Sequence, residues 1–488
     1  QVVGKKKSSQ FFNSKQAEIF VSISNFLPAT QSSSFLKFVK KFVSLQKEFF
    51  LANKDFLVAI VSLTVQKIGA ELHSSSAKGK GLVSGCLNIL RGIVKKEKLA
   101  TAFFDELDRL FGTFIPLLQA KDFDFEENIF DLFYFLMKKS DKMTSFADSL
   151  LNVFAHSMTQ NSRQIKFFPL FNLMLFKFRD FWSVEKLDKA FELLKTSLDM
   201  EANYESTSFG NSTAQGMLLL QVLIQCYPEQ VKQRYIQSIL ELFSQFNAGS
   251  IDDPFHFAAI FDKIFGIIFS VAIYLPETTF AFLESHDLLA QILNRIFINM
   301  KEFFTVYEKK LLIQFLSLCV KYYIAKHNTG QIVEILNRLI PFIKFQELLS
   351  SKKFVQRDSK KKAKDNELID SFELSYREIY DYLNLFDFNT FEKKEDEVEQ
   401  PLEIEEIMNT HPQYIYEKPK LVKLLESPVL ESDELQSFKD TIKQCFSSEG
   451  NGKEVIRGLL HELASKHFYS VLDRIQYVQF NIGPSSQA

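Results

Sequence analysis

The chain has 488 residues, of which 46% are hydrophobic, and a formal net charge of −2 at pH 7. A single hydrophobic core stops growing at about 250–300 residues, so the length predicts either several domains or one extended array. Because the charge is balanced, no overall electrostatic field draws the protein onto nucleic acid or an anionic membrane. We therefore expect no direct nucleic-acid partner.

The four cysteines are far apart and form no Cys-x-x-Cys motif: Cys86, Cys226, Cys319 and Cys445. They predict small buried side chains in a reducing compartment, the cytoplasm or the nucleus. The longest apolar run, residues 264–275, has about 12 residues where a membrane span needs roughly 20, so no transmembrane segment is expected. The sequence begins with Gln1 rather than Met, which fits a piece of a longer protein.

Helical patterning starts near residue 11 and continues to residue 349. Helices of roughly 13–20 residues alternate with short turns, so a helix pair takes about 40 residues, the length of a HEAT or armadillo unit. We therefore predict an all-α fold in which residues 1–350 form a HEAT/ARM-like α-solenoid, a superhelix of antiparallel helix pairs. Early in this stretch, the glycine cluster at residues 79–85 lacks the spacing of a phosphate-binding loop and is interpreted as a flexible connector between helices.

One helix of the array is predicted from a single apolar face that comprises Tyr235, Ile239, Leu242, Phe243 and Phe246. Breaks between helices are predicted at Tyr227–Pro228, at residues 247–254, at Leu275–Pro276 and at Ile340–Pro341. Asp253 is a favourable N-cap in front of Pro254, so a new helix is predicted to start there.

Two charged stretches interrupt the helical pattern after residue 350. Residues 351–366 are predicted to be a basic loop that contains Lys352, Lys353, Arg357, Lys360, Lys361, Lys362 and Lys364. Residues 367–390 are predicted to continue the helical repeat, and residues 391–410 to form an acidic loop. Helices are expected again over residues 411–480, and residues 481–488 are expected to be a flexible tail.

No motif for catalysis or cofactor binding is present in the sequence. The closest histidines, His461 and His467, are six positions apart, so they face different sides of a helix, unlike the i, i+4 pair of a helical zinc site. Neighbouring carboxylates such as Glu126 and Glu127 also point to different sides. A nucleophile elbow and a kinase motif set are both missing. We therefore expect no enzyme activity, no catalytic residue, no cofactor and no metal site.

Four blocks follow one another along the chain: residues 125–130, residues 217–226, residues 272–276 with 282–284 after them, and residues 309–319. Their order and spacing resemble the C-terminal half of the importin-β (karyopherin-β) superfamily, closest to the branch of importins seven and eight. The resemblance covers roughly residues 100–350. The chain departs from that branch at its basic loop, where the branch typically carries a long acidic one, and in having a single tryptophan.

The resemblance implies a nuclear transport receptor, a Ran-dependent karyopherin that carries protein cargo through the nuclear pore between cytoplasm and nucleus. Members of this superfamily hold cargo on a concave face and bind the Phe-Gly repeats of nucleoporins in grooves between outer helices. They bind the Ran GTPase mainly through an N-terminal half that lies outside this sequence. The acidic loop then becomes a candidate contact for basic cargo through Glu392, Glu395, Asp396, Glu397, Glu399 and Glu403, although a solvated linker without a binding role fits these residues equally well.

Two other functions fit the same pattern. The exportin that recycles importin-α has a similar layout of blocks. A HEAT-repeat scaffold in ribosome assembly or in trafficking shares the solenoid but needs neither Ran nor nucleoporins. Binding to Ran-GTP or to Phe-Gly repeats separates a transport receptor from such a scaffold.

Overall fold

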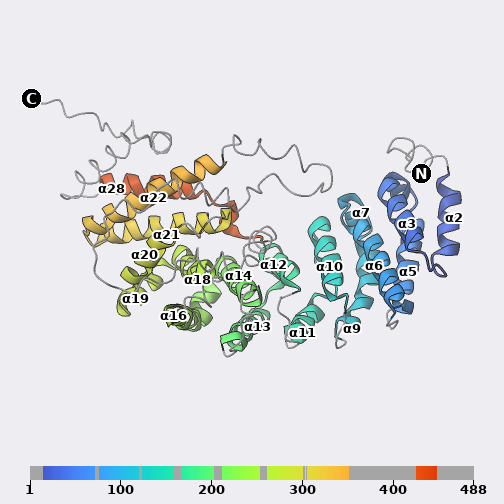
Figure 1. Ribbon diagram of the computed structural model, residues 1–488, viewed down its shortest axis with the longest axis horizontal. Coiled ribbons are helices and arrows are strands. Elements are labelled where there is room, and N and C mark those ends of the chain that lie inside the picture. The colour runs from blue at the N-terminus through green and yellow to red at the C-terminus, as the bar shows by residue number, and fades with distance from the viewer. Residues whose placement is uncertain are drawn as a thin grey trace, which may run out of the picture. The chain divides into compact units, whose positions relative to one another are not determined.

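The computed structural model describes residues 15–71, 76–119, 124–158, 166–202, 211–252, 261–300, 303, 305–350 and 425–447. Over these residues the secondary structure is helical throughout and contains no strand (Figure 1), which confirms the predicted all-α class. Contacts between the helices divide the chain into two compact units, Gln1–Leu219 and Leu220–Ala488, and α14 (Asn211–Cys226) crosses the boundary.

Unit 1 contains α2 (Gln16–Phe26), α3 (Ser33–Leu45), α4 (Lys47–Ala52), α5 (Lys54–Glu71), α6 (Ala77–Val94), α7 (Glu97–Ala102), α8 (Phe104–Phe111), η1 (Gly112–Phe114), α9 (Ile115–Leu118), α10 (Glu126–Ser140), α11 (Ala147–Met158), α12 (Phe168–Lys177), η2 (Arg179–Phe181) and α13 (Val184–Ala202). These helices pack in two rows, each of which follows the chain order (Figure 1). In one row α3 contacts α6, α6 contacts α10 and α10 contacts α12. In the other, α5 contacts α8, and α11 contacts both α9 and α13.

Aromatic side chains fill the space between neighbouring helices of unit 1. The rings of Phe154 and Phe167 stack with their centroids 4.4 Å apart, and Phe130 and Phe171 lie against Phe154 at 5.9 and 5.2 Å. Trp182 closes this cluster and donates a hydrogen bond from its indole nitrogen to the carbonyl of Met174 over 2.8 Å. Large rings bury much apolar area per side chain, and these four phenylalanines therefore hold α10, α11 and α12 together.

Unit 2 contains α15 (Pro228–Gln230), the π-helix η3 (Val231–Tyr235), α16 (Ile236–Asp252), α18 (Phe261–Tyr274), α19 (Pro276–Ser285), α20 (Leu288–Ile298), α21 (Val306–Ala325), α22 (Thr329–Ser350), α27 (Pro428–Glu431) and α28 (Glu434–Ser447), besides the end of α14. The helix α21 is central to this unit because it contacts α18, α22, α27 and α28. Apolar residues lie on all sides of α21, which is the pattern of a helix surrounded by protein.

Several predicted helix features are confirmed. The apolar face of residues 235–246 is buried along its whole length. A helix ends at Tyr274 and the next one begins at Pro276, as the Leu275–Pro276 pair predicts. A helix also covers residues 434–447, inside the stretch 411–480 where helices were expected.

The prediction of a flexible connector at residues 79–85 was wrong. These glycines lie inside α6, whose N-terminus is capped by Ser76 through a 3.0 Å hydrogen bond from the amide of Gly79. Gly85 faces Leu36 of α3 so closely that a Cβ atom there would lie 2.6 Å from the leucine Cδ1. Glycine is accommodated at position 85 because α3 packs closely against α6 there.

Two predicted breaks were also wrong. The helix α16 continues through residues 247–252, and Arg295 stabilises this part by donating hydrogen bonds to the carbonyl (3.3 Å) and side-chain (2.5 Å) oxygens of Asn247. The helix α22 continues past Pro341. A proline inside a helix loses one backbone hydrogen bond, and burial of Leu339, Phe342 and Ile343 on either side favours the helix in spite of that loss.

Other predictions fall outside the described residues. These are the helix start at Asp253–Pro254, the basic loop 351–366, the helical continuation 367–390, the acidic loop 391–410, the parts of residues 411–480 other than 425–447, and the tail 481–488. None of the helices in the described ranges is both long and apolar enough to cross a lipid bilayer.

Candidate functional site

The core of unit 2 contains polar side chains from helices that are far apart in the sequence. Gln221 and Gln225 project from α14, Ser270 from α18 and Tyr307 from α21, and all four are buried. Ser427, which precedes α27, is buried beside them. Buried polar groups destabilise a fold unless they are hydrogen-bonded, so each of these side chains needs partners.

Tyr307 occupies the middle of this polar network. Its hydroxyl donates to Oε1 of Gln221 over 2.9 Å and accepts from Nε2 of Gln225 over 2.8 Å. The same Nε2 of Gln225 also donates to the hydroxyl oxygen of Ser270 over 2.8 Å. Burial raises the pKa of Tyr307 well above its ordinary value, so its hydroxyl stays protonated and keeps donating at physiological pH.

A buried ion cluster adjoins the network. The ammonium group of Lys263 on α18 contacts the carboxylate of the preceding Asp262, and it donates to Oε1 of Glu308 on α21 over 2.5 Å. The second carboxylate oxygen of Glu308 accepts from the amide of Thr305 over 3.2 Å, while the Thr305 hydroxyl caps the amide of Glu308. This capping box fixes the start of α21 and at the same time aims Glu308 at the lysine.

Gly266 makes room for Gln221 between α14 and α18. The amide nitrogen of Gln221 donates to the backbone carbonyl of Lys263 over 2.8 Å. A Cβ atom at position 266 would lie 2.6 Å from that nitrogen and 2.7 Å from the side-chain oxygen. Only glycine therefore allows the Gln221 amide to lie flat against α18 in this position.

A C-terminal segment completes the network. The hydroxyl of Ser427 donates to Oε1 of Gln225 and accepts from the amide of Val429 over 3.1 Å, so that it caps α27 as well. On the other side of α27, the ammonium group of Lys310 donates to the carbonyls of Leu430 and Ser432 over 3.0 and 2.6 Å. We call residues 425–447 the C-terminal strap, because its start and α27 are bound to α14 and α21 by these polar contacts.

The network is built to hold helices together, and its groups are closed to a ligand. Gln221 and Gln225 are each hydrogen-bonded to Tyr307, and all three side chains are buried, so their polar groups are not exposed to a substrate in this conformation. The neighbouring Lys309 is also buried, which lowers the pKa of its ammonium group to about 8. Within the described ranges, no three or more His, Cys, Asp or Glu side chains are grouped so that they could hold a metal ion.

The candidate cargo contacts predicted from the sequence, Glu392, Glu395, Asp396, Glu397, Glu399 and Glu403, lie outside the described residues. The sequence interpretation missed the polar network. A signal was present, since Gln221 and Gln225 are spaced i, i+4 in an otherwise apolar helix, which puts two polar groups on one buried side. The partners of these glutamines could not be identified that way, because Tyr307 and Ser427 follow 82 and 202 positions after Gln225.

The carboxylate pair Glu126 and Glu127 also has a defined place in the structure. Glu126 is buried, accepts from Ser157 and forms an ion pair with Lys166 at 2.8 Å, whereas Glu127 is exposed. The two carboxylates thus point to different sides of α10, as predicted, and Glu126 links α10 to α11 and to the start of α12.

Comparison with known proteins gives no relative for this chain: no protein-family model, no curated protein and no solved structure matches it.

Proposed function

We propose that the chain is a HEAT-type α-solenoid that serves as the cargo-binding part of a nuclear transport receptor of the importin-β superfamily. The observation that carries this proposal is the packing of unit 1 into two rows of helices, each in chain order. An array in which each helix packs against its neighbours in sequence leaves long surfaces without internal partners, and such surfaces suit large protein ligands.

The four blocks on which the family resemblance rests lie in defined helices of the two units. Residues 125–130 start α10, residues 217–226 belong to α14, residues 272–276 join α18 to α19, and residues 309–319 lie in α21. Two of these helices, α14 and α21, provide Gln221, Gln225 and Tyr307 of the polar network. The block at residues 217–226 contains both glutamines of the network, and the block at residues 309–319 follows Tyr307 in the same helix, which supports packing as the origin of the resemblance.

In this proposal the partners are protein cargo, Phe-Gly nucleoporins and the Ran GTPase, and the protein moves between cytoplasm and nucleus. The acidic residues from Glu392 to Glu406 offer carboxylates to a basic cargo such as a histone or a ribosomal protein. The solenoid supplies the surface on which such a cargo is held.

The proposal is tested with an immobilised Phe-Gly repeat polypeptide and a matched polypeptide in which serine replaces each phenylalanine. We expect the 488-residue chain to be retained on the first and not on the second. Equal retention on both, or on neither, would reject the transport receptor and leave a HEAT-repeat scaffold of a large assembly, for example in ribosome biogenesis or trafficking. Retention on Phe-Gly repeats together with tight binding of importin-α would identify an exportin that recycles importin-α.

The cargo contact needs its own experiment. A histone is bound to the wild-type chain at increasing salt concentration, and to a variant with glutamine or asparagine in place of Glu392, Glu395, Asp396, Glu397, Glu399 and Glu403. We expect the variant to bind more weakly and with less salt dependence, because screened charge pairs supply the attraction. Unchanged binding would remove these residues from the proposal.

A further inference from the structure

A group of cations, exposed except for the half-buried Arg91, lies on two neighbouring helices of unit 1. Three come from α3, namely Lys37, Lys40 and Lys41, while Arg91 lies near the end of α6 and Lys95 just beyond it. Neither helix contains an acidic residue. We call these five residues the cationic face.

Helix geometry and close packing bring the five cations onto one surface. Positions 37, 40 and 41 are spaced i, i+3, i+4, so their side chains emerge from the same side of α3. The helix α3 lies against α6 at Gly92, where an added Cβ atom would be 3.7 Å from both Cγ of Lys40 and the hydroxyl oxygen of Ser44. The stem of Lys40 therefore packs against α6 at the position that follows Arg91.

The helix α10 borders the cationic face on its other side. The guanidinium carbon of Arg91 and the ammonium nitrogen of Lys95 lie 5.6 and 4.6 Å from the ring centroid of Phe135. Asp131 forms an ion pair with Nη2 of Arg91 at 2.5 Å. This carboxylate compensates one of the five charges.

Within the described ranges, the remaining charge has no compensating ion pair. Lys37, Lys40 and Lys41 form no ion pair with any other described residue. The Nε atom of Arg91 is buried and has no hydrogen-bond acceptor within the described part of the chain. The pKa of Lys95 is lowered by partial burial and by the nearby charge of Arg91, while Asp131 opposes the shift and Lys40 adds to it, so these cations lie close enough to repel one another. An external anion would relieve that repulsion.

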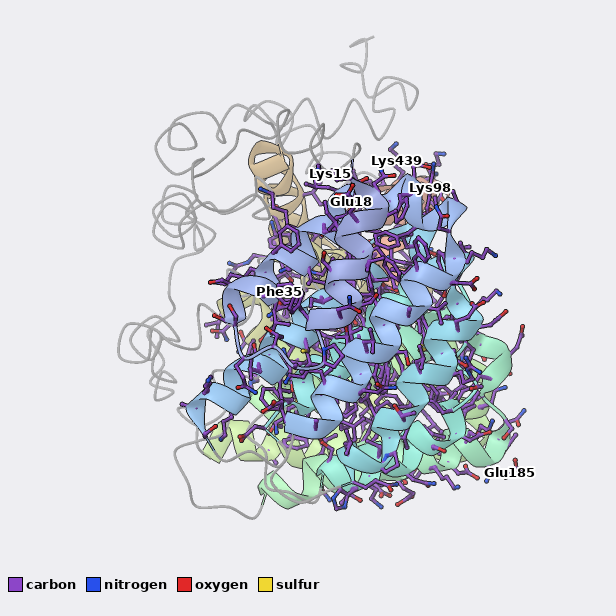
Figure 2. The ribbon with its side chains drawn as sticks, turned by 90° about the vertical axis from the view of Figure 1, so that its right-hand side faces the viewer. Lys15, Glu18, Phe35, Lys98, Glu185 and Lys439 are labelled. Atoms are coloured by element: carbon purple, nitrogen blue, oxygen red, sulfur yellow. The ribbon has the colours of Figure 1, made fainter. Side chains whose placement is uncertain are left out.

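Apolar side chains flank the lysines on α3. The rings of Phe35 and Phe38 stack at 6.3 Å, and Phe38 and Leu45 remain 36% and 40% exposed. Figure 2 faces these N-terminal helices, and Phe35 is labelled there. The surface therefore offers apolar area directly beside the cations. A ligand that covers both must carry apolar groups as well as negative charge, which free ions and water do not.

We propose that the cationic face, together with Leu45, binds an acidic segment of a partner protein that also carries apolar side chains. Single-strand binding uses aromatic rings on which bases stack. Nucleic acid fits this surface less well, because Phe38 stacks on Phe35 and the ring of Phe135 is occupied by Arg91 and Lys95. The proposal does not depend on nuclear transport, and it concerns a partner of opposite charge to the basic cargo discussed above.

The test measures binding of a fluorescent peptide in which glutamate alternates with phenylalanine, by fluorescence anisotropy at low and moderate salt. A second peptide has glutamine in place of each glutamate. The double variant Lys40→Gln/Lys41→Gln removes two charges from the cationic face, and Lys189→Gln/Lys195→Gln removes two from α13 as the matched control. Emission of Trp182 and circular dichroism check that each variant is folded.

We expect the acidic peptide to bind the wild type, the glutamine peptide to bind poorly, and the Lys40/Lys41 variant to bind about tenfold more weakly while the control is unchanged. No binding of the acidic peptide, or equal weakening in both variants, would overturn the proposal. Tighter binding of a single-stranded oligonucleotide than of the peptide, with the same loss in the Lys40/Lys41 variant, would reassign the surface to nucleic acid.

Discussion

The side chains of Ser427 and Gln225 are hydrogen-bonded to each other although 202 positions separate them in the chain. This contact ties the C-terminal strap to α14, and through Gln225 to Tyr307 of α21. Holding two residues so far apart in the chain together is entropically unfavourable. Their contact therefore persists only where the interactions around it are strong. The strap has such contacts: Ser427 is bonded to Gln225, and Ser432 accepts hydrogen bonds from Lys310 and Gln314 of α21.

Replacing Ser427 with alanine should loosen the strap. The substitution removes the hydrogen bond to Gln225 and the cap of α27 together, with an expected loss of about 1–2 kcal/mol. Faster amide hydrogen exchange in residues 428–447 would report the loss, since local opening exposes the backbone. Ser437→Ala in α28 is the control and should leave exchange unchanged. If both variants exchange alike, Ser427 does not hold the strap.

Replacing Gly266 with alanine should destabilise unit 2. The added methyl group would lie 2.6 Å from the Gln221 amide, and relieving that overlap should cost about 1–3 kcal/mol. The measurement is thermal unfolding followed by circular dichroism. Gly69→Ala is the control, because that helical glycine has open space around it and alanine there should stabilise α5 by up to about 1 kcal/mol. A Gly266→Ala protein as stable as wild type would contradict the close packing of Gln221.

Replacing Lys263 with methionine should be the most damaging of these changes. It removes the cation that both Asp262 and Glu308 contact, and the loss of one partner from a buried ion cluster costs about 3–5 kcal/mol. Chemical denaturation measures the effect. Adding Asp262→Asn and Glu308→Gln in the same protein removes the excess negative charge and should restore part of the stability. No recovery in the triple variant would show that the lysine acts through packing and not through charge.

Lys309 should make the free energy of unfolding increase with pH in the alkaline range. Its pKa is about 8 in the folded protein, against about 10.4 for an ordinary lysine. Between these two pH values the unfolded chain holds a proton that the folded chain has released, so stability rises with pH over this window. Lys309→Met should be about 1–3 kcal/mol more stable than wild type at pH 7, and the difference should shrink between about pH 8 and 10. A pH-independent difference between the two proteins would contradict the lowered pKa.

Features that depend on neighbouring residues could be predicted from the sequence. The all-helical class follows from apolar spacing, as in residues 235–246, because a period of 3.6 residues puts these side chains on one face. The boundary at Leu275–Pro276 follows from the missing amide of proline, which suits the first turn of a helix. These features depend on the backbone and a few adjacent side chains, which the sequence contains in full.

Tertiary structure decided the rest. Gly85 lies inside a helix because α3 packs against it, and α22 continues past Pro341 because residues beside the proline are buried. In the same way, the two glutamines of α14 became a core network through Tyr307 and Ser427, whose positions depend on how α21 and the strap pack. Burial and hydrogen bonding between distant residues contribute more free energy than local propensity at such positions, and which residues meet there is a property of the folded chain.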